Sequence, residues 1–276
     1  MSTPYLKQPV WKPEVGIYFF FGGLAGASAI LGFGARLVGN ARLARSALLS
    51  ASLGAAVSPP LLIVDLGRPS RFLNMFRVLK PTSPMSVGSW VLGAFGGLAG
   101  AAAVSELTGI LRPLGRLAEA GAALLGLPLS TYTAVLVANT AVPVWHRARA
   151  ILPFVFAAGA AASAGAAAAV LTPVREAGPA RRLALLGAVG ELAAVTVMES
   201  SLGDDAAPYN SGPAAAPAQA AKALIATGAA ILGLGGTRRP LAVAGGSLIL
   251  AGSLAERMAV LRAAKNSVLA ARPGRG

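Results

Sequence analysis

The 276-residue sequence contains no cysteine and only one histidine, His146. Without thiolates the chain cannot ligate an iron–sulfur cluster, and one imidazole cannot supply both axial ligands of a bis-histidine haem. A structural zinc site lacks its usual ligands for the same reason. If this protein takes part in redox chemistry, the sequence therefore predicts an electron carrier that is held without metal ligands.

Charged residues are also scarce: they make up 12% of the chain, whereas 55% is hydrophobic and the mean hydropathy is +0.66. These values lie outside the range of ordinary soluble domains. Uncharged runs long enough to cross a hydrocarbon layer of about 30 Å as helices lie at 15–35, 46–64, 81–105, 120–145 and 150–174. The net charge of +14 does not indicate nucleic acid binding, because lysine and arginine lie between these runs, where they meet lipid head groups or a partner.

The hydropathy pattern predicts an all-α polytopic membrane protein with eight transmembrane helices in one integral membrane domain, 1–276. The expected spans are 15–38, 46–64, 85–105, 120–144, 150–171, 183–201, 219–235 and 241–261. They divide into a four-helix half, 15–145, and a second four-helix half, 150–261. An even number of spans places both termini on one side of the membrane. Positive residues are numerous on both sides, and the acidic 202–218 loop favours external termini.

Two polar residues begin the first span. Glu14 and Tyr18 are four residues apart and therefore share one helical face, which Gly22 and Gly26 continue as a smooth row. Such a groove below two polar groups suits a flat ring with carbonyl oxygens. From spacing alone, however, a glutamate at the water boundary beside an interfacial tyrosine is the favoured interpretation.

Further polar residues have two interpretations each. Asp65 and Arg68 end the second span and either pass protons or close the loop as a salt bridge. Tyr132 lies in a polar cluster of the fourth span. The ordinary interpretation is a core tyrosine whose hydroxyl group is hydrogen-bonded within the protein. Glu191, in the middle of the sixth span, is a candidate for proton transfer, although an arginine-paired glutamate that locks two helices is slightly favoured. His146 is favoured as an interfacial anchor over a surface proton relay.

Three segments carry a family resemblance: 61–90 (LLIVDLGRPSRFLNMFRVLKPTSPMSVGSW), 11–28 (WKPEVGIYFFFGGLAGAS) and 130–145 (STYTAVLVANTAVPVW). They resemble the NrfD/PsrC family, the quinone-binding membrane subunits of molybdenum-dependent oxidoreductases such as polysulfide reductase. The resemblance covers roughly the first half of the chain, and the second half matches in hydropathy only.

The resemblance implies a quinone, menaquinone or ubiquinone, bound in the first four-helix bundle near the head of the first span. It implies that the quinone contacts are Glu14, Tyr18, Asp65 and Tyr132. The chain would be the membrane anchor and quinone-reactive subunit of a complex in the cell inner membrane, without a haem or iron–sulfur cluster of its own. A ferredoxin-like iron–sulfur subunit would dock on the 65–84 connection, and a molybdopterin catalytic subunit would lie beyond it. The expected docking residues are Arg68, Arg71, Arg77 and Lys80.

Two other classes of function remain open on the sequence. A proton-coupled transporter would explain Glu191 and the helices rich in glycine and proline. A passive membrane anchor would explain the basic loops without any bound quinone.

Overall fold

The computed structural model describes residues 11–66, 72 and 74–270, and the regular structure within them is helical. Eight of the described helices are long and apolar enough to cross a membrane. They are α1 (Pro13–Leu37), α2 (Ala41–Leu66), α4 (Pro84–Thr108), α5 (Arg112–Ala138), α7 (Leu152–Leu171), α8 (Gly178–Leu202), α10 (Ala215–Gly235) and α11 (Arg239–Ala270). The predicted all-α polytopic membrane protein with eight spans is confirmed.

Short elements connect some of these helices. Helix α6 (Pro143–Arg147) and the 3₁₀ turn Ala148–Ala150 lie between α5 and α7. Helix α9 (Ala207–Asn210) lies between the 3₁₀ turns Gly203–Ala206 and Gly212–Ala214, and together they join α8 to α10. Proline stands in one of the first two positions of six long helices, where its missing N–H has no helical partner in any case.

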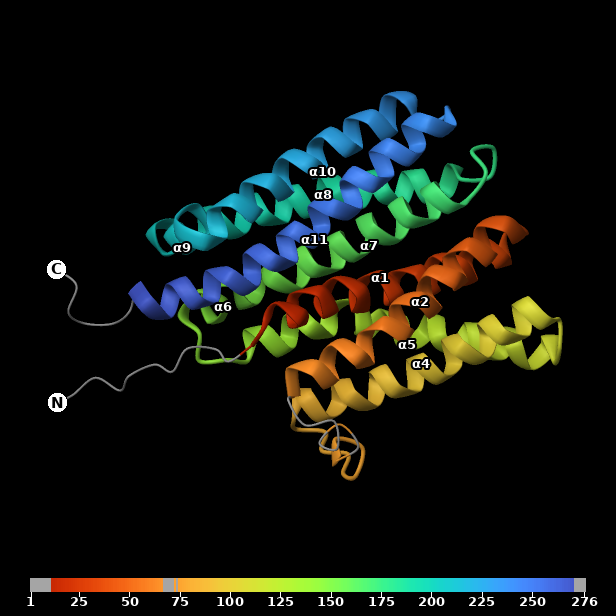
Figure 1. Cartoon of the computed structure of the whole chain (residues 1–276), viewed down its shortest axis with the longest axis horizontal. Coiled ribbons are helices and arrows are strands. Elements are labelled where there is room, and N and C mark those ends of the chain that lie inside the picture. Colours follow the sequence, from red (N-terminus) through yellow and green to blue (C-terminus); the bar gives the residue numbers. More distant parts are fainter. Residues whose placement is uncertain (1–10, 67–71, 73, 271–276) are drawn as a thin grey trace.

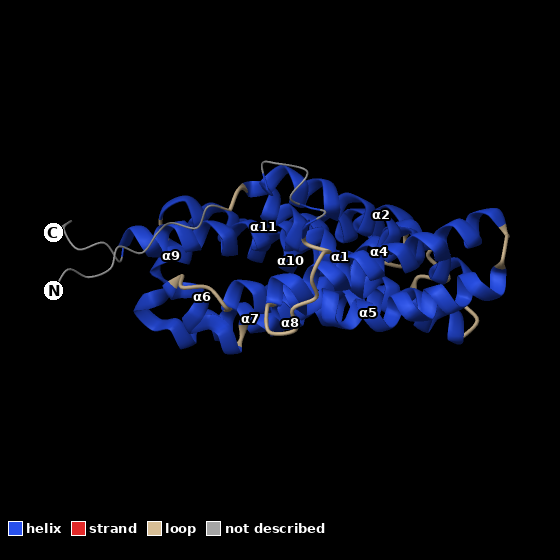
Figure 2. Cartoon of the chain, turned by 90° about the horizontal axis from the view of Figure 1, so that it is seen from below, coloured by secondary structure: helices blue, strands red, loops and turns tan. Residues whose placement is uncertain are grey.

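The long helices run roughly along one common direction (Figure 2). Helices α1, α2, α4 and α5 pack together, as do α7, α8, α10 and α11, and α1 contacts α7 and α11 where the two groups meet (Figure 1). Aromatic rings fill part of this junction. Phe19 of α1 packs on Phe156 of α7 with 5.8 Å between ring centroids, and Trp11 stacks on the buried Trp145 at 5.3 Å. The junction is therefore a packed core rather than a flexible linker region.

Large apolar side chains cover the outward surface of the helices. Leu117, Leu124, Leu186 and Leu234 are all exposed, and Leu234 is 93% accessible. A soluble protein avoids a surface of this kind because exposed leucine costs free energy in water, whereas a hydrocarbon layer solvates it. The chain is thus a multi-pass membrane protein.

The boundaries of the fourth predicted span were wrong. The prediction was 120–144, whereas α5 begins at Arg112 and ends at Ala138. The helix starts earlier because Glu119, which hydropathy excludes from a span, pairs with Arg36 of α1. It ends earlier because the chain turns after Asn139, where the Thr140 hydroxyl accepts a hydrogen bond from the Val142 N–H, and Pro143 then begins α6.

The start of α1 and the end of α11 lie at the same end of the molecule, as an even number of spans requires (Figure 1). The end of α2, the start of α4, the end of α5 and α9 share this end, which we call the N-terminal face. The opposite face carries the connections from α1 to α2 and from α4 to α5.

Candidate functional site

The four predicted site residues come from three helices of the first group and lie toward the N-terminal face. Glu14 and Tyr18 are in the first two turns of α1, Asp65 is at the end of α2, and Tyr132 is in the second half of α5. Tyr18 is buried, and its phenol lies within electrostatic range of the half-buried Tyr132. Two phenols from different helices thus lie near one another in the interior.

Glu14 provides the clearest sign of an incomplete polar site. Its Oε2 atom is buried and accepts no hydrogen bond from the described residues. A buried carboxylate oxygen without a donor costs free energy, so such an atom commonly marks a place where a further donor binds. Because Glu14 stands one turn above Tyr18, the unpaired oxygen and the Tyr18 hydroxyl belong to the same face of α1.

Asp65 connects the end of α2 to the start of α1. Its Oδ1 atom accepts a hydrogen bond from the backbone N–H of Lys12 at 3.2 Å, and the Lys12 ammonium group lies 3.5 Å from the Val64 carbonyl oxygen. Lys12 is the residue that precedes α1, so the Asp65 carboxylate also lies at the positive end of that helix. Asp65 therefore positions the head of α1 next to α2, a contact that the sequence did not reveal. The Arg68 partner considered in the sequence lies outside the described residues.

Tyr132 is held in place by a glycine of α4. A Cβ atom built at Gly88 would overlap the Cζ, Cε1 and hydroxyl atoms of Tyr132. The ring therefore lies directly against the α4 backbone, and a side chain at position 88 would displace it. Glycine at this position allows the phenol to reach the interior between α4 and α5.

An apolar groove begins within one turn of Gly88, between α2 and α4. It has a volume of about 350 Å³. Its walls include Pro59 of α2, Phe72 and Phe76 of the connection, and the glycines Gly93 and Gly96 of α4. Small residues on α4 leave this space open because they carry no side chain to fill it.

The predicted docking residues lie on or near the connection between α2 and α4. Arg77 and Lys80 are exposed there, together with the apolar side chains of Val78 and Leu79. Arg68 and Arg71 lie outside the described residues. The connection is anchored by an aromatic row in which Phe76 contacts Phe72 and Trp90 at centroid distances of 5.4 and 5.7 Å. A fixed segment thus displays two cations and two apolar groups on the N-terminal face.

The remaining two candidates lie elsewhere. Glu191 is fully buried in α8, in the second group of helices. His146 is exposed on α6, and its Nε2 atom lies 3.0 Å from an Nη atom of Arg149. The structure therefore does not bring Glu191 or His146 into contact with the four residues at the head of α1.

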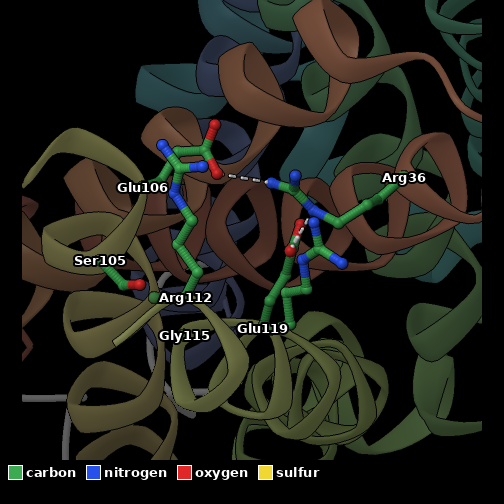
Figure 3. A pocket seen from close by; sticks show the side chains of 8 residues that line it. Arg36, Ser105, Glu106, Arg112, Gly115 and Glu119 are labelled. Carbon is green, nitrogen blue, oxygen red and sulfur yellow. Dashed lines mark hydrogen bonds and ion pairs between the residues drawn. The ribbon is translucent and has the colours of Figure 1, made fainter. Parts of the chain in front are cut away.

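A charged cluster that the sequence analysis did not identify lies at the opposite face (Figure 3). Arg36 of α1 donates to Glu106 of α4 at 3.0 Å and to the buried Glu119 of α5. Arg112 and Arg116 complete a pocket of about 180 Å³ with these residues. The available signal was the presence of arginine and glutamate at the ends of the first, third and fourth spans. The pairing joins residues 70 and 83 positions apart, which hydropathy cannot show.

The fold and the site define a helical, multi-pass membrane protein with a polar cluster inside its first group of four helices. The family model described as "Polysulphide reductase, NrfD" matches residues 3–201, and the chain belongs to this family. NrfD proteins are membrane subunits of redox enzyme complexes, so the predicted role as a membrane anchor is confirmed. No curated protein sequence matches the chain.

Proposed function

We propose that the chain is the quinone-reactive subunit of its complex and binds a quinone between α1, α2, α4 and α5 at the N-terminal face. One observation carries the proposal: the buried Glu14 Oε2 atom has no hydrogen-bond donor among the residues that the structure describes, and it shares a helical face with Tyr18. The family match supports it, because a membrane subunit of a redox complex lies where membrane-soluble electron carriers diffuse.

The residues present fit such a ligand. Glu14 provides a free acceptor for a hydroxyl group, and Tyr18 and Tyr132 provide hydroxyl donors for a carbonyl oxygen. The apolar groove between α2 and α4 is suited to an isoprenoid tail, because small and aromatic residues line it. A bound quinone would supply the electron transfer, since its carbonyl and hydroxyl forms interconvert with the transfer of electrons and protons.

Each residue then has a defined task. Glu14 would take up or release a proton at its Oε2 atom, as a general base or acid toward a bound hydroxyl group. Tyr18 and Tyr132 would orient the ring by hydrogen bonds. Asp65 holds the head of α1 through the Lys12 N–H and gives Glu14 an acidic neighbour toward the surface. Protons would pass between the quinone site and the N-terminal face through Glu14 and Asp65.

The partner surface is the connection that carries Arg77 and Lys80. These cations, with exposed Val78 and Leu79, suit the acidic and apolar surface of an iron–sulfur subunit. Docking there would bring the partner close to the end of α2 and hence to Asp65. A molybdopterin subunit beyond that partner would provide the substrate chemistry.

The test is quinone-linked turnover of the assembled complex with Glu14→Gln and Tyr132→Phe. Both changes preserve shape, so the complex should assemble while turnover falls, with Glu14→Gln the more severe because it removes the proton acceptor. Glu176→Gln, on the opposite face, is the matched control, and its turnover should equal the wild type. Unchanged turnover in both site variants would favour the passive anchor. Substrate transport by the isolated chain would favour the proton-coupled transporter.

A further inference from the structure

Three ionisable side chains are buried together in the second group of helices. Glu191 of α8 is fully buried, and Glu256 and Arg257 of α11 are each 2% exposed. Glu191 stands near the middle of its span, 13 residues after the start of α8 and 11 before its end. Charged groups at this depth of a membrane are costly, so a functional site is the default hypothesis for them.

The contacts of this cluster are few and incomplete. Ser253 donates to Glu191 Oε2 at 2.7 Å. The Nη2 atom of Arg257 donates to the Phe156 carbonyl at 3.2 Å and lies 3.8 Å from Glu191 Oε1, too far for a hydrogen bond. The guanidinium also lies over the Phe156 ring, 4.1 Å from its centroid. Within the described part of the chain, Glu191 Oε1 and Arg257 Nη1 are both buried without a hydrogen-bond partner.

The formal charges of the cluster do not cancel. Two carboxylates, Glu191 and Glu256, lie within electrostatic range of one guanidinium, that of Arg257, so the ionised cluster would carry one net negative charge. The nearby Lys222–Glu199 pair, at 2.5 Å, is already neutral. An uncompensated charge in an apolar interior is strongly unfavourable, and a carboxylate there takes up a proton instead.

We propose that Glu191, Glu256 and Arg257 form a proton-binding site inside the membrane, in which one of the two carboxyl groups holds a proton. Gly159 of α7 is part of this site. A Cβ atom there would overlap both Arg257 Nη2 and Glu191 Oε1, so the glycine leaves the space in which the two groups approach. The proposal concerns the chain alone and does not depend on quinone binding.

The neighbouring polar groups connect this site to one side of the membrane. Glu256 lies within electrostatic range of Glu199 and Lys222, and the buried hydroxyl of Tyr209 lies within range of Glu256 and Glu199. Tyr209 belongs to α9 on the N-terminal face, and the Lys222 side chain is partly exposed. Among residues 11–66, 72 and 74–270, the other packed elements add no titratable group at the cluster: α7 contributes backbone carbonyls, and α1 contributes Gly16. Protons would therefore enter and leave from the N-terminal face.

Infrared spectroscopy of the full chain in lipid nanodiscs at neutral pH tests the proposal. A protonated carboxyl group gives a carbonyl band that shifts in D₂O. In Glu191→Gln the ionisable groups that remain are Glu256 and Arg257, and in Glu256→Gln they are Glu191 and Arg257. In each variant one carboxylate balances one guanidinium, so the cluster is neutral without binding a proton. Each variant should therefore lose one carboxyl equivalent of this band. Glu176→Gln, in an exposed ion pair, should leave the band unchanged.

Removing the cation should have the opposite effect. In Arg257→Gln two carboxyl groups remain without compensation, so the band should gain one equivalent. Tyr209→Phe should keep the band but slow its shift in D₂O, because the route to the surface loses a hydroxyl. A band unchanged in both Glu191→Gln and Glu256→Gln would overturn the site. A band that sodium removes at constant pH would assign a metal cation instead, and unchanged exchange in Tyr209→Phe would overturn the route.

Discussion

Gly88→Ala is a change at a residue that does not touch the proposed quinone and should nevertheless weaken its binding. The new methyl group would overlap the end of the Tyr132 ring. Because the obstructing atoms belong to the tip of one side chain, the ring should move and the helices should stay in place. If Tyr132 then loses one hydrogen bond to the ligand, worth about 1 kcal/mol, the dissociation constant should rise about fivefold.

The assay is a titration of the full chain in nanodiscs with a short-tailed quinone, followed by tryptophan fluorescence. Gly34→Ala is the matched control, because a Cβ atom there meets nothing within 4 Å. It should bind normally and gain about 0.5–1 kcal/mol from the helix propensity of alanine. Tyr132→Phe should weaken binding as Gly88→Ala does, and the double variant should add nothing further. Normal binding in Gly88→Ala, or fully additive losses, would refute the reasoning.

Three further predictions concern stability, each measured as the thermal unfolding midpoint in nanodiscs. Arg36→Ala should destabilise by about 3 kcal/mol because it leaves the buried Glu119 without its cation, whereas Arg42→Ala, from an exposed pair, should cost at most about 1 kcal/mol; equal midpoints would contradict this. Trp145→Phe should cost about 1–3 kcal/mol because the buried Nε1 donates to the Val260 carbonyl at 2.9 Å. Trp90→Phe is the control: its ring is exposed, so the unfolding midpoint should change little if the Trp145 hydrogen bond is the cause. Gly126→Ala should cost about 1–3 kcal/mol because its methyl group would overlap the Gly26 carbonyl of α1; a midpoint as high as that of Gly34→Ala would show that the two backbones can separate freely.

The sequence was sufficient to predict the class, the family and the number of spans. Transfer of a helix into lipid depends on its own residues, so hydropathy records each span locally. The family motif is one continuous stretch of sequence, residues 61–90, so it can be recognised without the fold. The family match confirms that resemblance. The helix ends were less accurate where a charge lies inside a span, as at Glu119, because its cost depends on a partner from another helix.

Only the tertiary structure decided which polar groups meet. Arg36 pairs with Glu106 and Glu119. Glu191 accepts a hydrogen bond from Ser253, 62 positions away, and lies 3.8 Å from Arg257. Asp65 bonds to the N–H of Lys12, a backbone group that no side-chain pattern reveals. Such contacts depend on which helices are neighbours and how each is rotated. Which helices become neighbours depends on close backbone approaches, such as that of Gly26 in α1 to Gly126 in α5. Such an approach needs a glycine on each of two helices, so neither sequence segment predicts it alone.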